Sequence, residues 1–203
     1  MFVEGMGWIR PTPVRVTVNL EQGRQMAEQR ESYRSYRTRT ENWGVGFIPN
    51  AVFVGMLGEL AVADFLTHTM HEPHEVDTTP QRLGDGGCDF QVNGIRIQVK
   101  TERAVGYYYP NLLLRRYRDN GTICRFPWTC VIGCRYTPDT NFVELLGYCS
   151  RQECLTHGEL RPAKQGNHMN LEVPYTRFHS IRDLPYQLRE QTPALCNSDS
   201  EDE

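Results

Sequence analysis

Residues 89–100 read Asp-Phe-Gln-Val-Asn-Gly-Ile-Arg-Ile-Gln-Val-Lys, and they constrain the fold more than any other stretch of the chain. Asn93-Gly94 is the preferred dipeptide for a two-residue type I′ turn, and apolar residues alternate with polar ones on both sides of it. This pattern predicts a β-hairpin in which Asp89 lies opposite Gln98. The register decides which side chains share a face, and so which side chains can act together.

The predicted hairpin has one apolar face and one polar face, because successive side chains of a strand point to opposite sides. The apolar face consists of Phe90, Val92, Ile95, Ile97 and Val99, and the polar face of Asp89, Gln91, Arg96, Gln98 and Lys100. Directly opposed residues lie about 4.5–5.5 Å apart at Cβ. Asp89 and Gln98 can therefore share one small ion, with Lys100 one step along the same face. Metal-assisted phosphodiester cleavage needs this combination of groups.

The segment from Gly84 to Asp89 reads Gly-Asp-Gly-Gly-Cys-Asp, and Gln98-Val99-Lys100-Thr101 follows it after the turn. Together they resemble the core of the PD-(D/E)XK nuclease superfamily. Asp89 falls at the first acidic position, Gln98 stands where a second acid is usual, and Lys100 matches the lysine. This Q-x-K variant is similar to Mrr-like restriction enzymes and to small phage-type nucleases. The resemblance covers residues 50–150.

The resemblance also assigns a place to Glu59, in Gly58-Glu59-Leu60-Ala61, because the superfamily often carries a glutamate on the helix before the hairpin. An apolar run over residues 51–66 predicts that helix. The implied fold is α/β (α+β), a restriction-endonuclease-like core with a central mixed β-sheet flanked by helices. The implied cofactor is Mg²⁺, for which Mn²⁺ can substitute.

The implied activity is hydrolysis of DNA phosphodiester bonds, in phage or mobile-element DNA processing. Asp89, Gln98, Lys100 and Glu59 are the candidate catalytic residues. Metal ligands are expected from Asp89, Glu59, the Gln98 side-chain carbonyl and the Val99 backbone carbonyl, while Lys100 orients the attacking water or neutralises the phosphate. Because Gln98 stands where the superfamily usually has an acid, the site has one negative charge fewer. This keeps an alternative open, a weak or inactive nuclease-like domain that binds nucleic acid or a protein partner.

Asp, Gln and Lys are common on the solvent-exposed face of any strand. Two observations favour a catalytic site over this simpler interpretation. Glu59 lies in a helix dominated by apolar residues, and a glutamate is seldom buried without a partner. Of the 22 basic residues, only Lys100 and Lys164 are lysines. One of two lysines in an arginine-rich chain thus stands at the lysine position of the motif.

Two arginine clusters predict contacts with DNA phosphates. A helix is expected after Asn19, which can serve as its N-cap. In that helix Arg30, Arg34 and Arg37 recur at helical spacing and share one face. The alternative is a solvated helix face. The second cluster is Arg115, Arg116 and Arg118, which would suit a substrate-facing loop, whereas the three tyrosines before it, Tyr107, Tyr108 and Tyr109, would suit a strand.

The chain is predicted to divide into an N-terminal arm with an arginine-rich helix (1–45), the nuclease-like domain (46–188) and an acidic disordered tail (189–203). Residues 190–203 carry five acidic residues and no Lys or Arg. Strands are expected over residues 128–136 and 142–148, and Ser150 is expected to cap a short helix with Glu153 at its third position. Residues 161–180 are expected to be rich in loops.

The remaining patterns favour a cytoplasmic protein, or the host-cell interior if it is viral. The start lacks a basic segment before an apolar run, no apolar run approaches a membrane span, and seven cysteines without paired spacing suit a reducing environment. DNA is the expected partner, without a membrane, and a homodimer would allow both strands to be cut. A zinc alternative rests on the loose spacing of Cys130, Cys134, Cys149 and Cys154. Buried reduced cysteines are the simpler interpretation.

Overall fold

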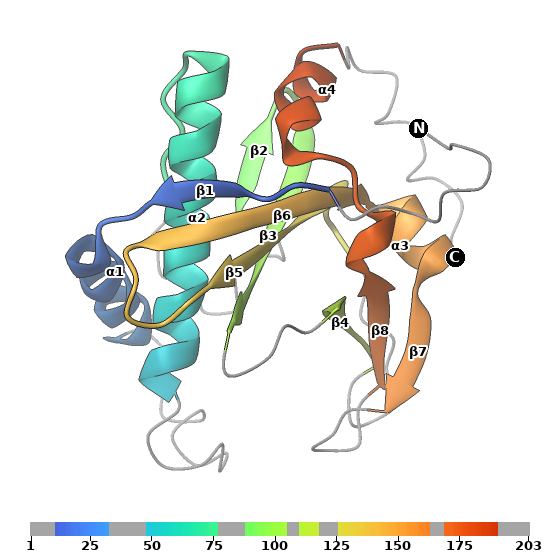
Figure 1. Ribbon diagram of the computed structural model, residues 1–203, viewed down its shortest axis with the longest axis horizontal. Coiled ribbons are helices and arrows are strands. Elements are labelled where there is room, and N and C mark those ends of the chain that lie inside the picture. The colour runs from blue at the N-terminus through green and yellow to red at the C-terminus, as the bar shows by residue number, and fades with distance from the viewer. Residues whose placement is uncertain are drawn as a thin grey trace.

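The predicted hairpin forms one edge of a mixed sheet (Figure 1). The computed structural model describes residues 11–32, 48–76, 88–104, 110–117, 126–162 and 169–190. Within these residues the central sheet has the strand order β1-β6-β5-β3-β2, and a second sheet has the order β4-β8-β7. The central strands are β1 (Val14–Thr17), β2 (Phe90–Val92), β3 (Ile95–Arg103), β5 (Cys130–Tyr136) and β6 (Phe142–Ser150). The second sheet consists of β4 (Asn111–Tyr117), β7 (Glu159–Pro162) and β8 (Met169–Pro174).

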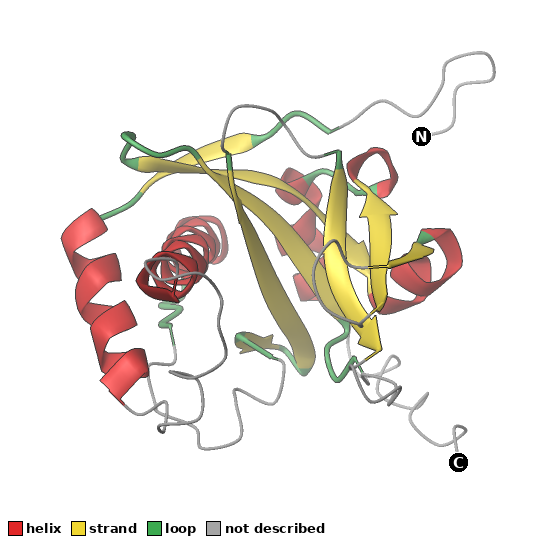
Figure 2. Ribbon diagram, turned by 90° about the horizontal axis from the view of Figure 1, so that it is seen from below, coloured by secondary structure: helices red, strands yellow, loops and turns green. Residues whose placement is uncertain are grey.

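Both faces of the central sheet are covered, one by helices and the other mainly by the second sheet. Figure 2 shows α1 and α2 on one side, and the second sheet with α3 on the other. The helices are α1 (Leu20–Ser32), α2 (Ile48–Met70), α3 (Arg151–His157) and α4 (Leu184–Glu190), and the short 3-10 helices are η2 (Tyr175–Arg177) and η3 (Ile181–Asp183). One apolar core lies between α2, α4 and the central sheet, and another lies between the two sheets.

The expected mixed sheet flanked by helices is confirmed. β3 pairs with β5 in parallel, and the other strand pairs of the described residues are antiparallel. The segment 1–45 contributes β1, which pairs with β6, and α1, which packs on α2. These two elements are therefore built into the fold. Residues 191–203, most of the predicted acidic tail, lie outside the described residues.

The prediction that residues 161–180 are rich in loops is wrong, because the strand β8 occupies Met169–Pro174. Its residues alternate between buried and half-buried positions, and it pairs with β4 on one side and β7 on the other. Pro162 and Pro174, which favour loops, are the last residues of β7 and β8. Arg115 and Arg116 are also placed differently from a substrate-facing loop, because both belong to β4.

The hairpin has the predicted register, with Phe90 opposite Ile97 and Val92 opposite Ile95. The turn residues Asn93 and Gly94 have φ values of 49° and 81°. Both values lie in the left-handed region that a type I′ turn requires and that Asn and Gly tolerate best. All five side chains of the predicted apolar face are buried (Phe90, Val92, Ile95, Ile97 and Val99).

Helix α2 packs tightly against β3 at Gly58. A Cβ atom added there would lie 1.8 Å from the Thr101 hydroxyl oxygen and 3.0 Å from its Cβ. The absence of a side chain at Gly58 thus lets the neighbouring Glu59 sit close to the strand that carries Gln98 and Lys100. The Thr101 hydroxyl is buried and has no hydrogen-bond partner among the described residues.

Gly58→Ala is expected to destabilise the protein by about 1–3 kcal/mol, because the new methyl group overlaps a β-branched side chain attached to a rigid strand. The gain in helix propensity from Gly to Ala offsets only about 1 kcal/mol of this. Chemical denaturation measures the difference. Thr101→Ala in the same protein should restore most of the stability. A double variant as unstable as Gly58→Ala would contradict the contact as the cause.

Ser150 and Glu153 form the predicted capping box of α3. The Glu153 carboxylate accepts hydrogen bonds from the Ser150 hydroxyl at 2.7 Å and from the Ser150 backbone N–H at 3.0 Å. His179 Nε2 lies 2.7 Å from its other oxygen. Burial alone would raise the pKa of Glu153, but the bonds from Ser150 and His179 outweigh burial and lower it.

Glu153→Gln is expected to cost about 1 kcal/mol of stability at neutral pH, a usual value for a helix cap. Because the folded-state pKa of Glu153 is lowered, its stabilisation is present above the unfolded value of 4.5 and is lost as the pH falls through the folded value. Unfolding curves of the wild type and the variant should therefore converge below pH 4.5. A difference that stayed constant across this range would exclude the carboxylate charge as its origin.

The long helix α2 is apolar along much of its length. Its window Val52–Met70 would be long and apolar enough to cross a membrane, but 61% of that window is buried inside the protein. It packs against α1 on one side and β3 on the other. Its length and composition are accounted for by these contacts.

Candidate functional site

Asp89 lies next to the start of β2, and its carboxylate contacts the neighbouring strand β3. Oδ2 accepts a hydrogen bond from the Val99 backbone N–H at 2.6 Å and another from Gln98 Nε2. The Asp89 N–H in turn donates to the Ile97 carbonyl at 2.8 Å. Asp89 is only 8% exposed. The hairpin thus brings Asp89, Gln98 and Val99 into direct contact.

The side chains of Gln98 and Lys100 point away from α2, on the opposite face of β3. Val99 packs in the core that α2 covers, and Thr101 lies against Gly58, so the residues alternating with them point to the other side. Gln98 is 4% exposed, whereas Lys100 is exposed. Across the sheet Lys100 pairs with Gly133, over which the Tyr175 ring packs. Lys100 therefore lies next to the buried Gln98 but reaches solvent.

Glu59 is 5% exposed, and its carboxylate is held by Arg30 of α1. Arg30 Nη1 and Nη2 donate to the two Glu59 oxygens at 2.9 and 2.8 Å. This bidentate pair gives the buried acid the partner that its apolar helix requires. It also engages Arg30, which the sequence predicts as a phosphate contact. The ion pair thus holds the Glu59 carboxylate against α1.

The pKa of Cys134 on β5 responds to the charges of both Asp89 and Glu59. Burial raises the pKa of the Cys134 thiol well above its usual range, and the negative charges of Asp89 and Glu59 raise it further. Thr101, which touches the helix beside Glu59, is the strand partner of Cys134. Each of the two carboxylates has its own hydrogen-bond donors, Val99 and Gln98 for Asp89 and Arg30 for Glu59.

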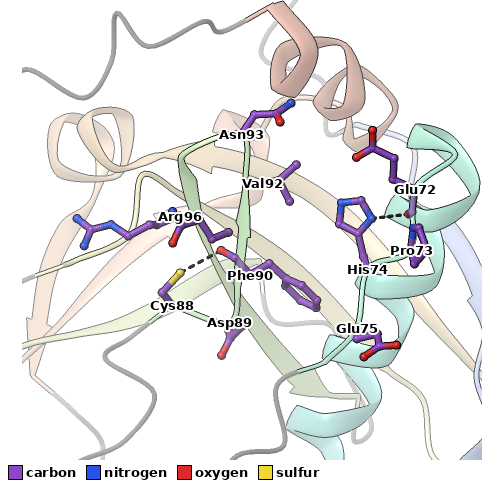
Figure 3. A pocket seen from close by; sticks show the side chains of 11 residues that line it. Glu72, Pro73, His74, Glu75, Cys88, Asp89, Phe90, Val92, Asn93 and Arg96 are labelled. Atoms are coloured by element: carbon purple, nitrogen blue, oxygen red, sulfur yellow. Dashed lines mark hydrogen bonds between the residues drawn. The ribbon is translucent and has the colours of Figure 1, made fainter.

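A pocket of about 710 Å³ opens beside the outer edge of β2. Figure 3 shows Phe90 and Val92 pointing toward the segment after α2, and Cys88 and Arg96 on the other side of the hairpin. Asp89 contributes to the lining, so the pocket joins the candidate site to solvent. The lining carries three acidic residues (Glu72, Glu75 and Asp89) and one arginine (Arg96), which favours a cation there.

The donor set suits a hard divalent cation. The Asp89 carboxylate, the Gln98 amide and the Val99 carbonyl are joined by hydrogen bonds, since Gln98 Nε2 also donates to the Val99 carbonyl at 3.3 Å. Mg²⁺ prefers oxygen ligands and keeps several waters, so it does not need a dense cluster of carboxylates. No group of three or more His, Cys, Asp or Glu side chains that could hold a metal occurs among the described residues. Any ion here would depend on amide and backbone oxygens.

The other predicted nucleic-acid contacts are not assembled within the described residues. Arg34, Arg37 and Arg118 lie outside the described residues. Arg115 and Arg116 lie in β4, and their side chains are also outside what is described. Only Arg30 of the six is described in full, and it binds Glu59. The proposed DNA contacts therefore stay predictions.

The four cysteines of the zinc alternative do not converge. Cys130 and Cys134 lie in the core on the α2 side of the central sheet, whereas Cys149 and Cys154 lie in the core between the two sheets. All four are buried and reduced. The simpler interpretation as core residues accounts for them.

One buried ion pair near the site has no counterpart among the sequence predictions. Arg135 of β5 is 2% exposed, and its Nε donates to Glu102 of β3 at 2.6 Å. Glu102 follows Lys100 by two residues and so shares its face of the strand. An arginine inside the apolar run of β5 is the signal that could have suggested a buried partner.

Comparisons with known proteins return no relative. No family model, no curated protein and no solved structure matches the chain. The site's geometry and chemistry are therefore the basis for assigning a function.

Proposed function

We propose that this protein is a Mg²⁺-dependent nuclease that hydrolyses DNA phosphodiester bonds on a restriction-endonuclease-like core. The observation that carries the proposal is the contact among Asp89, Gln98 and Val99, with Lys100 next on the strand. An acid, an amide oxygen, a backbone oxygen and an ammonium group within one hairpin suit metal-assisted phosphate chemistry.

Each residue has a role that follows from its position. A bound Mg²⁺ would lower the pKa of a coordinated water and stabilise charge on the phosphate. Asp89, Gln98 and the Val99 carbonyl would hold that ion. Lys100 is exposed beside them, where its ammonium can bind a phosphate oxygen and orient the attacking water. Glu59 has a structural role in this proposal, because Arg30 holds its carboxylate.

A second candidate function is binding of nucleic acid or a protein without cleavage. The observation that favours it is that both buried acids are engaged by donors from the protein itself. Asp89 accepts from Val99 and Gln98, and Glu59 accepts from Arg30. Such acids can stabilise the fold without a metal.

The two functions are separated by incubating purified protein with supercoiled plasmid and single-stranded DNA, in Mg²⁺, in Mn²⁺ or in EDTA. The nuclease proposal expects cleavage that requires the metal and is strongly reduced by Lys100→Ala. Lys100 is exposed, so this variant should keep the wild-type melting temperature. DNA binding without cleavage in any metal would favour the second function. Cleavage at the wild-type rate by Lys100→Ala would contradict the catalytic assignment.

A further inference from the structure

The Gln98 side chain is held in one orientation by its two hydrogen bonds. Its amide nitrogen donates to Asp89 Oδ2 and to the Val99 carbonyl at 3.3 Å. Both contacts are buried, and Asp89 Oδ2 receives a further N–H from Val99. The nitrogen end of the amide therefore faces the oxygen atoms that a cation would bind.

A primary amide carries its donors and its acceptor at opposite ends, so it cannot present both to Asp89 at once. With its oxygen toward Asp89, Gln98 would place two negative ends together in a site from which water is largely excluded. Such an arrangement is unfavourable unless a cation lies between them. With its nitrogen toward Asp89, it supplies a charge-assisted hydrogen bond and no ligand.

We propose that Gln98 switches between two amide orientations, with N–H bound to Asp89 in the absence of a divalent cation and C=O turned to the cation in its presence. This inference rests on the proposed metal site at Asp89. It adds that the Gln98 N–H group takes the place of the cation at Asp89 when no cation is bound. The metal must displace a hydrogen bond to a charged group, which lowers its affinity by roughly 10- to 100-fold. In return the Asp89 carboxylate keeps a hydrogen-bond donor when no metal is bound.

Gln98→Glu tests the inference, because a carboxylate cannot donate an N–H in its ionised form. In EDTA the variant should melt at a lower temperature than the wild type, since two buried carboxylates then face each other. It should bind Mn²⁺ at least about tenfold more tightly than the wild type, as a lower Kd measured by isothermal titration calorimetry. Gln152→Glu is the matched control. It introduces the same charge at an exposed position of α3, outside the hairpin, so both quantities should stay at wild-type values.

A measurement on the wild-type protein covers the case in which Gln98→Glu does not fold without metal. The side-chain amide resonances of Gln98, assigned by their loss in Gln98→Met, should shift strongly when Mg²⁺ is added. Those of Gln152, on α3, should not. Gln98 resonances that stay unchanged at saturating Mg²⁺ would overturn the inference, as would equal Mn²⁺ affinities in the wild type and Gln98→Glu.

The same experiments separate this inference from the proposed function. Absent cleavage together with tighter Mn²⁺ binding by Gln98→Glu would contradict the nuclease and support the amide switch. Cleavage with equal Mn²⁺ affinities would contradict the switch and leave the nuclease standing. Failure of both proteins to bind Mn²⁺ would overturn the switch and the metal site together.

Discussion

Asp89→Asn is expected to lower Mg²⁺-dependent DNA cleavage by at least about 100-fold, because it removes the carboxylate that would bind the metal. The change preserves the size of the side chain. The carbonyl oxygen of the new amide can still accept a hydrogen bond from the Val99 N–H, so the end of the hairpin should stay folded. Initial rates of plasmid nicking at saturating Mg²⁺ measure the effect.

Asp139→Asn provides the control for this comparison. Asp139 is exposed in the turn between β5 and β6 and has a φ of 66°, a conformation that asparagine tolerates well. The variant has the same chemical change and should cleave at the wild-type rate. If Asp89→Asn also cleaved at that rate while remaining folded, Asp89 would have only a structural role, and the second function would become the better assignment.

Glu59→Gln is expected to destabilise the protein by about 2–4 kcal/mol, because it leaves the Arg30 guanidinium without its counter-charge in a largely buried place. The side chains are 23% exposed for Arg30 and 7% exposed for Glu59. The pair also links α1 to α2, so the loss should be accompanied by faster hydrogen exchange in α1. Urea denaturation at neutral pH gives the change in free energy of unfolding.

Glu21→Gln is the matched control for the ion pair. Glu21 pairs with Arg24 on the same helix, and the two side chains are 59% and 60% exposed. Exposed pairs contribute about 0–1 kcal/mol, so this variant should be close to the wild type. Equal losses in the two variants would show that burial does not strengthen the Arg30–Glu59 pair.

Local features of the fold follow from the sequence because neighbouring residues determine them. The type I′ turn at Asn93-Gly94 sets the hairpin register, and with it the meeting of Asp89 and Gln98. The capping box of Ser150 and Glu153 is equally local. In each case a few adjacent residues fix the backbone, and alternation then assigns the faces.

Contacts between distant segments could not be predicted in the same way. The sequence indicates that Glu59 needs a partner, but nothing in the spacing selects Arg30 from 20 arginines. The second sheet was missed for a similar reason, because β4 and β8 are stabilised by pairing with each other across a long separation. Alternation over residues 169–174 was present but short. Pairing partners, and the packing between sheets, depend on the whole chain.

The pairing of β1 with β6 also constrains the time course of folding. Val14 lies opposite Leu145, so β1 must wait for the synthesis of β6 before it can join the sheet. The hairpin that carries Asp89 and Gln98 needs only residues close in sequence and can form on a microsecond scale. Contacts of large sequence separation form slowly. During synthesis, the local geometry of the candidate site can therefore appear well before the sheet that encloses it is complete.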